Sequence, residues 1–315
     1  KNMKIIPLET KHLPQIRKLW NHEMPTSFRL REDLFVSQIE SSQDMNWKAS
    51  FVAIEHNEVI GSIIIKSWER DVLEAYQHTA WLTLIHVAST HRKQGIGTEL
   101  FHKALKQLDT QHITTIHLGK SMNNFFCGVP EGFNNSEFFE KIGFIENDRP
   151  VDMHKHIVTQ TMIPLRQKTD FDIRIATMDD FEAIHQFFVK NFPGRWQLEF
   201  EEYVAAGYTG NEFAIIEKDH HVIAFCRINQ PGISMNMYNT NFTNDFTNLY
   251  GVGPLGVDKD MRDYSLGFDV TAYAINHAVT QGASDIIIDW TGLVSFYQKF
   301  GFEVWNRYIS MKYSL

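Results

Sequence analysis

The sequence predicts a mixed α/β protein built from two related domains in tandem. First, a length of 315 residues suits about two domains. Second, apolar runs of strand length alternate with segments whose apolar residues recur at helical spacing. Third, a glycine-containing segment between a strand and a helix in the first half returns about 170 residues later.

The first copy of this segment follows the apolar run Leu82–Val87 and precedes a helical pattern that begins at Ile96. Gly95 and Gly97 let backbone N–H groups approach a ligand at the positive end of the helix dipole. A pyrophosphate suits such a position, and nearby basic side chains add positive charge. The candidate phosphate-binding residues here are His86, Val87, Arg92, Lys93, Gln94, Gly95, Ile96, Gly97 and Thr98.

The second copy aligns with the first without a gap, so that Arg262 and Gly267 take the places of Arg92 and Gly97. Ser265 replaces the first glycine of the pair. Serine keeps its N–H group but carries a Cβ, so it adopts positive φ less freely than glycine. The candidate binding residues of this copy are Leu255, Gly256, Val257, Arg262, Asp263, Tyr264, Ser265, Leu266 and Gly267.

The repeat extends over nearly the whole chain. Each half reads as strand, helix, hairpin, strand, loop, helix, strand, helix and strand. The late segments Phe138–Phe144 and Phe296–Phe302 share an aromatic-x-Lys-x-Gly-Phe ending. The polar run 166–170 separates an ending strand from a starting one, so the predicted domains are 1–166 and 167–315.

Composition restricts the function classes. A net charge of −8 argues against a non-specific nucleic-acid binder, which needs a basic face. Cys127 and Cys226 are too few for a disulfide framework, so we expect a reducing cytoplasm. The sequence has no signal peptide or apolar run near 18 residues, so we expect neither export nor a membrane span. The histidines lack metal-site spacing, so we expect no metal. We also expect the protein to be a monomer or a weak homodimer.

Each half resembles a GNAT-superfamily N-acetyltransferase domain, whose acetyl-CoA loop reads Arg/Gln-x-x-Gly-x-Gly/Ala. Arg92–Gly97 fits this pattern fully, whereas Arg262–Gly267 departs from it at Ser265. The resemblance implies two GNAT-like domains, each with a mixed, mostly antiparallel sheet, flanking helices and a V-shaped cleft. It also implies acetyl-CoA binding in both halves, with a backbone N–H around Leu255–Val257 polarising the thioester carbonyl.

Catalysis is predicted for the second half alone. In GNAT domains the helix after the last cleft strand usually carries a tyrosine near the sulfur, and Tyr297 has this position, whereas the first half has Phe139. Asp289 lies between the apolar strand 286–288 and Trp290. Poor solvation there favours a raised carboxyl pKa, as suits a general base. The alternatives are a core tyrosine and an aspartate that caps the following turn.

The run Asp289–Tyr297 further resembles the active segment of glucosamine and glucosaminide N-acetyltransferases, which are tandem GNAT enzymes. This resemblance implies Asp289 as base, Tyr297 as acid and a small amine as acceptor. Arg195, Trp196 and Trp290 are the predicted acceptor-binding residues, because an indole offers a flat face to a sugar and a guanidinium can donate to hydroxyls. Alternatively, Trp196 packs behind a Pro-Gly turn.

Two other functions remain open at this stage. One is acyl transfer to a different small amine, as in mycothiol synthases. The other is a CoA-binding regulatory protein without turnover, which the replacement at Ser265 mildly favours and the presence of Asp289 and Tyr297 disfavours.

Overall fold

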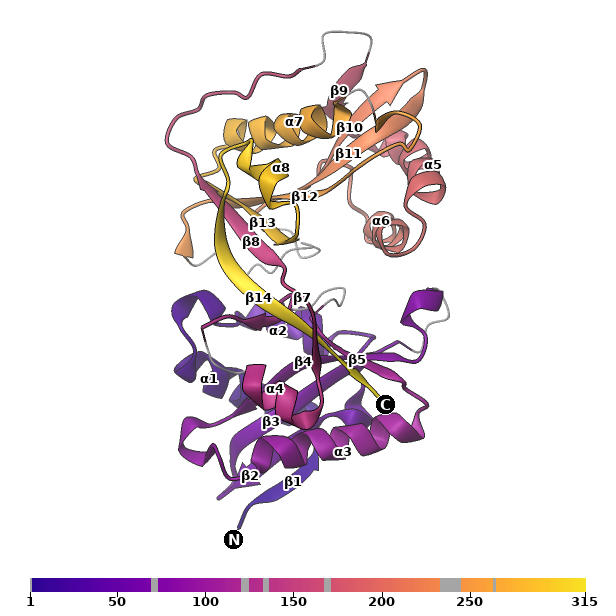
Figure 1. Ribbon diagram of the computed structural model, residues 1–315. Helices are drawn as coiled ribbons and strands as arrows, with labels where there is room; N and C mark the ends of the chain where they lie inside the picture. Colours follow the sequence, from indigo (N-terminus) through magenta and orange to yellow (C-terminus); the bar gives the residue numbers. More distant parts are fainter. Residues whose placement is uncertain are drawn as a thin grey trace. The chain divides into compact units, whose positions relative to one another are not determined.

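The computed structural model describes residues 2–68, 73–119, 125–132, 136–166, 171–232, 245–262 and 265–315 (Figure 1). The chain forms two compact units. The first consists mainly of Lys1–Val151 with Asn306–Leu315, and the second mainly of Asp152–Tyr238 with Phe246–Trp305.

The first unit contains a mixed, largely antiparallel sheet. Its strands, in spatial order, are β1 (Lys4–Pro7), β2 (Phe51–Glu55), β3 (Glu58–Ser67), β4 (Thr79–Val87), β5 (Thr115–Leu118) and the last part of β14 (Glu303–Ser314). Among these neighbours only β4 and β5 run parallel. The short strands β6 (Val129–Pro130) and β7 (Ile145–Asp148) pair with β14.

Helices cover both faces of this sheet. They are α1 (Leu13–Glu23), α2 (Glu32–Phe35), α3 (Ile96–Thr110) and α4 (Ser136–Ile142). Side chains alternate between the two faces of a strand, and β3 shows the result directly. Ile63 and Ile65 belong to the core cluster beneath α3 and α4, whereas Ile64 belongs to the cluster beneath α1 and α2. The strand is apolar on both sides because it is buried on both sides.

The second unit repeats this architecture. Its strands, in spatial order, are β8 (Val151–His156), β13 (Asp285–Thr291), β12 (Leu249–Val257), β11 (His221–Asn229), β10 (Phe213–Lys218) and β9 (Asp172–Ile175). Its helices are α5 (Phe181–Asn191), α6 (Arg195–Ala205), α7 (Leu266–Thr280) and α8 (Val294–Gln298). Helices α5 and α6 pack on the opposite face of the sheet from α7 (Figure 1).

The compact units differ from the predicted halves 1–166 and 167–315, because the strand ends are exchanged. Asp152–His156 lie in the first half of the sequence but belong to the second unit. Conversely, Asn306–Leu315 belong to the first unit, where Met311–Ser314 pair with β5. The unit to which a strand belongs is therefore set by the strands with which it shares backbone hydrogen bonds, and not by its position in the sequence. The sequence boundary itself stays a prediction, because residues 167–170 lie outside the described part of the chain.

Within the described residues, no helix is long and apolar enough to cross a membrane.

Candidate active site

In the second unit, the parallel strands β12 and β13 are hydrogen-bonded over only part of their length and then diverge. Their pairing covers only Leu249–Gly251 and Asp285–Ile287. Beyond this point β12 continues to pair with β11 as far as Val257. In the first unit β4 and β5 do the same, since pairing ends at Leu82 while β4 runs to Val87. Each unit thus has the V-shaped divergence of strands that the fold prediction included.

The divergence exposes backbone donors on one edge of β12. The N–H of Asp258 donates to the carbonyl oxygen of Ile223 at 2.8 Å, on the β11 side. Because successive N–H groups of a strand point to alternate sides, those of Val257 and Leu255 point toward the side that β13 has left. They are the donors that the sequence predicted for a substrate carbonyl.

Packing explains why position 256, on the same strand, is a glycine. A Cβ built at this position lies 2.5 Å from Cε2 of Phe192 and 2.9 Å from Cε1 of Phe225. The two rings pack directly on the strand at this point and leave no room for a side chain. The glycine therefore serves aromatic packing beside the divergence.

The N-cap residue of α7 has the same left-handed backbone as the N-cap residue of α3. Ser265 adopts φ 56° and ψ 25° at the N-cap of α7, as Gly95 adopts φ 82° at the N-cap of α3. Serine therefore meets the left-handed requirement, at an expected cost of about 1–2 kcal/mol relative to ordinary backbone. Arg262 is exposed. The predicted binding residues Asp263 and Tyr264 lie outside the described residues.

The second glycines of the two loops differ in their surroundings. A Cβ at Gly97 would lie 3.1 Å from the ring of Phe138, so packing alone accounts for that glycine. A Cβ at Gly267 would meet nothing closer than Cδ1 of Leu255 at 3.5 Å. A side chain at Gly267 would therefore begin in ordinary van der Waals contact, so packing does not account for this glycine at the N-terminus of the 15-residue helix α7.

Asp289 and Tyr297 share one electrostatic environment. Asp289 is half-buried near the end of β13, and Tyr297 on α8 is only 3% exposed. Burial raises the pKa of the Tyr297 hydroxyl well above its usual value, and the charges of Cys226 and Asp289 raise it further. The charge of Asp289 thus acts on Tyr297, and the catalytic roles of both residues stay a prediction. The first unit has Phe139 instead, packed 5.3 Å from Phe138 and 5.8 Å from Phe144.

Two of the three predicted acceptor-binding residues are in contact. The guanidinium carbon of Arg195 lies 4.5 Å from the ring centroid of Trp290. Nε of Arg195 also donates to the Glu199 carboxylate at 2.8 Å. Trp196 instead packs on the aromatic core, 4.8 Å from Phe192 and 5.7 Å from the ring of Phe225. Its predicted contact with an acceptor stays a prediction.

In the first unit, Glu23 at the end of α1 contacts the end of β4 and the loop that follows it. Its carboxylate accepts hydrogen bonds from the Ser89 N–H at 2.8 Å and from Arg92 at 3.0 Å, and contacts Nε2 of His86 at 2.9 Å. Burial acts to raise the pKa of Glu23, but these bonds and charges hold it below its ordinary value. Arg92 also donates to the carbonyl oxygen of Val87.

The second unit carries a neutral residue at the corresponding helix end. Asn191 ends α5 as Glu23 ends α1, and its side-chain oxygen accepts the Lys259 N–H at 3.0 Å. The same backbone position is thus capped in both units, by a carboxylate in one and by an amide in the other. The difference in charge bears on any anionic ligand that approaches these loops.

Aromatic side chains fill the first unit beside its divergence. Phe125 is fully buried and stacks on Phe35 at 5.8 Å. Phe126 stacks on Trp20 at 6.1 Å, and Trp20 contacts the ring of His86 at 5.3 Å. In the second unit, only the short turn 292–293 connects β13 with α8. In the first unit, aromatic side chains therefore pack against His86, in the part of β4 that no longer pairs with β5.

Sequence reasoning missed three acidic residues: Glu23, Glu199 and Asp152. Asp152 is 3% exposed on β8, and its Oδ1 accepts the Trp290 N–H at 3.2 Å. A carboxylate between the apolar neighbours Val151 and Met153 was the available signal.

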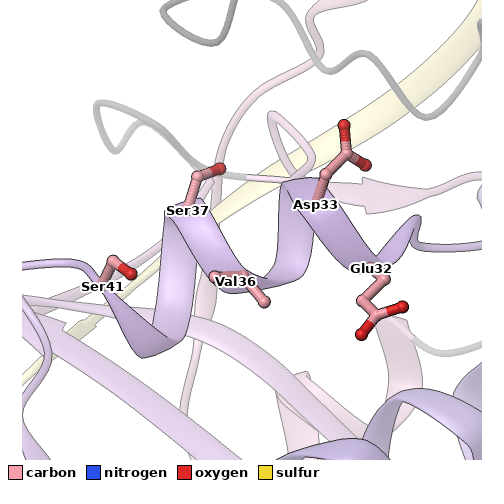
Figure 2. Close-up of a pocket in the computed structure, with 5 residues that line it drawn as sticks. All are labelled: Glu32, Asp33, Val36, Ser37 and Ser41. Carbon is pink, nitrogen blue, oxygen red and sulfur yellow. The ribbon is translucent and has the colours of Figure 1, made fainter.

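A separate pocket on the first unit is lined by Glu32, Asp33, Val36, Ser37 and Ser41 (Figure 2). It shares no residue with the predicted site.

Each unit thus has a helix N-terminus that follows a strand diverging from its parallel neighbour, the arrangement that the sequence predicted to bind acetyl-CoA. The chain belongs to the acetyltransferase (GNAT) family, whose model matches residues 13–144 and 181–302. It is an acyl-CoA-dependent N-acetyltransferase, and acetyl-CoA is the donor that the family uses. The predicted resemblance and fold class are confirmed.

Solved structures support the tandem fold. One is the glucosamine N-acetyltransferase region of a fungal multi-domain GH3 β-N-acetylglucosaminidase, with 20% identity and a TM-score of 0.86 over 99% of this chain and 38% of that one. Another is a GCN5-related N-acetyltransferase from Sphaerobacter thermophilus (11% identity, TM-score 0.72, 100% and 96% coverage). A tandem GNAT protein from the clavulanic acid pathway follows (12%, 0.67, 99% and 98%). At these identities the likeness is one of fold. No curated protein matches the sequence.

Proposed function

We propose that the second unit transfers the acetyl group of acetyl-CoA to the amino group of glucosamine or a glucosaminide. Asp289 serves as the base and Tyr297 as the acid. The observation that carries this proposal is the position of both residues beyond the point where β12 and β13 stop pairing, with Asp289 near the end of β13 and Tyr297 on the next helix, α8. The sugar class draws further support from the fungal structure, which is described as a glucosamine N-acetyltransferase region.

The donor would be held by the N-terminus of α7 and the free edge of β12. N–H groups at Ser265–Gly267 suit the pyrophosphate, Arg262 adds positive charge, and Gly267 has no Cβ that would hinder close approach. Acetyl-CoA supplies the activated acyl group as a thioester. The N–H groups of Leu255 and Val257 would donate to the thioester carbonyl oxygen, where negative charge develops.

The proton balance assigns one task to each catalytic residue. An amine attacks only after it has lost a proton, and Asp289 accepts that proton directly or through one water. A C–N bond then forms as the C–S bond breaks. Tyr297 donates its hydroxyl proton to the leaving sulfur, because a hydroxyl with a raised pKa remains protonated at neutral pH.

The acceptor would lie against the Arg195–Trp290 pair. Arg195 already donates to Glu199 and lies on the indole, so its guanidinium is held in a defined plane. Such a plane can donate to the hydroxyl groups of a sugar ring. In this arrangement the amino group faces Asp289, the neighbour of Trp290 in the chain.

In the described part of the first unit, the position that corresponds to Tyr297 is occupied by Phe139. Phe139 replaces the tyrosine and carries no exchangeable proton, and the aromatic side chains of Phe125 and Phe126 fill the space beside the divergence. We therefore assign turnover to the second unit alone.

The test is turnover with acetyl-CoA against glucosamine, chitosan oligomers, a lysine peptide and a polyamine. We expect the highest kcat/KM with glucosamine or the oligomers, and none with any acceptor in an Asp289→Asn/Tyr297→Phe double variant. A clear preference for the peptide or the polyamine would overturn the sugar assignment. Full activity of the double variant would move catalysis elsewhere.

A further inference from the structure

Asp152 is a buried carboxylate without a role in the proton transfers above. It lies on β8 and is 3% exposed. A buried charge persists only where hydrogen bonds compensate for its lost hydration. One compensating bond comes from the Trp290 N–H, 3.2 Å from Oδ1 of Asp152. Asp152 and Trp290 are 138 residues apart in sequence, so only the strand exchange brings them together.

The Trp290 backbone is unusual for a residue of its size. Its φ is 48°, in the left-handed region that bulky L-residues rarely adopt. Such conformations persist where the surroundings over-determine them, and they concentrate at functional sites. A hydrogen bond from this N–H to the buried Asp152 side chain stabilises the orientation, and its loss would leave a buried polar group without this partner.

The peptide group that donates to Asp152 joins the two residues of interest. It carries the carbonyl of Asp289 and the N–H of Trp290, so its orientation sets ψ of Asp289 and φ of Trp290, on which the directions of both side chains depend. On one side is the half-buried base, which interacts with Tyr297. On the other side is the indole, with the Arg195 guanidinium 4.5 Å from its centroid.

The contacts continue beyond the indole. Arg195 is held by Glu199, which is 6% exposed. Burial raises the pKa of Glu199, and Arg195 partly offsets this effect. Asp152 and Glu199 are therefore buried acidic residues at the two ends of one contact series, through Trp290 and Arg195.

We propose that Asp152 is a positioning residue for the acceptor side of the active site. By accepting the Trp290 N–H, it fixes the orientation of the Asp289–Trp290 peptide group and the left-handed conformation of Trp290. It thereby orients both the proposed base and the Trp290–Arg195 pair. The proposal rests on the proposed function for the identity of the amine, but the positioning itself does not depend on which amine is used.

The kinetic test compares Asp152→Ala with Asp152→Asn. Asparagine keeps a side-chain oxygen that accepts the Trp290 N–H, whereas alanine has none. We expect Asp152→Ala to lower kcat/KM for glucosamine by on the order of 10- to 100-fold, as fits the loss of a hydrogen bond to a charged group. The KM for acetyl-CoA should stay within about twofold of wild type, and Asp152→Asn should recover most of the loss.

Asp285 provides a matched control on the same two strands. It is 5% exposed at the other end of β13 and contacts His154 and His156 of β8 at 2.8 and 2.9 Å. Asp285→Asn should lower the melting temperature without changing kcat/KM for the amine. An equal kinetic loss in Asp285→Asn would overturn the proposal, because the effect would then be a general weakening of β8 against β13.

A second readout needs no substrate. The contribution of Trp290 to the near-UV circular dichroism is the difference between a protein that contains it and its Trp290→Phe counterpart. This difference should shrink in the Asp152→Ala background and persist in the Asp152→Asn background. An unchanged signal in Asp152→Ala, or equal kinetic damage in both variants, overturns the positioning role. If wild-type protein does not acetylate glucosamine, the proposed function fails while this spectroscopic test still decides the present inference.

Discussion

The guanidinium of Arg195 lies over the ring of Trp290, 4.5 Å from its centroid. The two residues come from the start of α6 and the end of β13, and they are 95 positions apart in sequence. Because the cation covers part of the indole, a sugar acceptor of the kind we propose would meet a plane of N–H donors as well as an aromatic face. Two of the three predicted acceptor residues thus lie together, and Trp290 is next in the chain to Asp289, whereas Trp196 packs on the core.

Replacing Asp289 tests the proposed base. Asp289→Asn preserves shape and hydrogen bonding but removes the charge, so kcat/KM for glucosamine should fall by on the order of 10²-fold or more while acetyl-CoA still binds. The deficit should shrink as pH rises, because free amine then no longer needs the base. Steady-state kinetics from pH 6 to 9 would measure this. An equal loss at every pH, together with a lost fold, would make Asp289 a structural cap.

Replacing Tyr297 tests the proposed acid. Tyr297→Phe should lower kcat by roughly 10²-fold, the low end for general-acid catalysis, because a thiolate is a fair leaving group. The KM for acetyl-CoA should change little, since the hydroxyl matters mainly as the thiolate forms. Wild-type kcat in the variant would return Tyr297 to a purely structural role.

The pKa of Tyr297 has a consequence for the pH profile. Burial raises it above the ordinary value of about 10, so the hydroxyl stays protonated throughout the usual assay range. As the acid, Tyr297 must be protonated to act, and activity is lost only when pH rises through its folded-state pKa. We therefore expect no alkaline loss of kcat below about pH 10. A fall with a midpoint near pH 8 that disappears in Tyr297→Phe would contradict this expectation.

The N-caps of α7 and α3 provide a reciprocal pair of substitutions. Ser265 has φ 56°, which glycine adopts without a Cβ penalty, so Ser265→Gly should leave stability equal or raise it by up to about 1 kcal/mol. Acetyl-CoA binding should be unchanged or slightly tighter. Gly95→Ser should cost about 1 kcal/mol without a clash, because no atom lies within 4 Å of the added Cβ. Thermal unfolding and calorimetric titration measure both effects. A large loss of binding in Ser265→Gly would reveal a contact of the serine side chain.

The loop of the first unit is predicted to bind CoA without turnover. Arg92→Glu should weaken that binding while most turnover, which belongs to the second unit, remains. Glu23→Gln should strengthen it, because the Glu23 carboxylate now bonds to Arg92 and would repel phosphates. Calorimetry that separates two classes of CoA site would measure both. Loss of turnover in Arg92→Glu with unchanged occupancy of the second unit would refute the division of labour.

Much of the fold follows from local patterns. The strand–loop–helix segment, its second copy and the family were all readable from residues that lie close together in the chain. Asp289 and Tyr297 could be paired for the same reason, since eight positions span one strand-to-helix joint. The special backbone of the loops was readable as well, because a glycine at Gly95 marks a left-handed position that Ser265 then has to share.

The sequence by itself determined the repeat and the family, and it located the pair of residues for which we propose catalytic roles. Only the tertiary structure decided which strands complete which unit, since Met311–Ser314 pair with β5 across almost 200 residues of chain. It alone brought Asp152 to the Trp290 N–H and placed Arg195 on the indole. Local patterns report what a segment prefers. Strand partners and buried carboxylate contacts depend on which distant segments share hydrogen bonds, and no spacing within one segment records that choice.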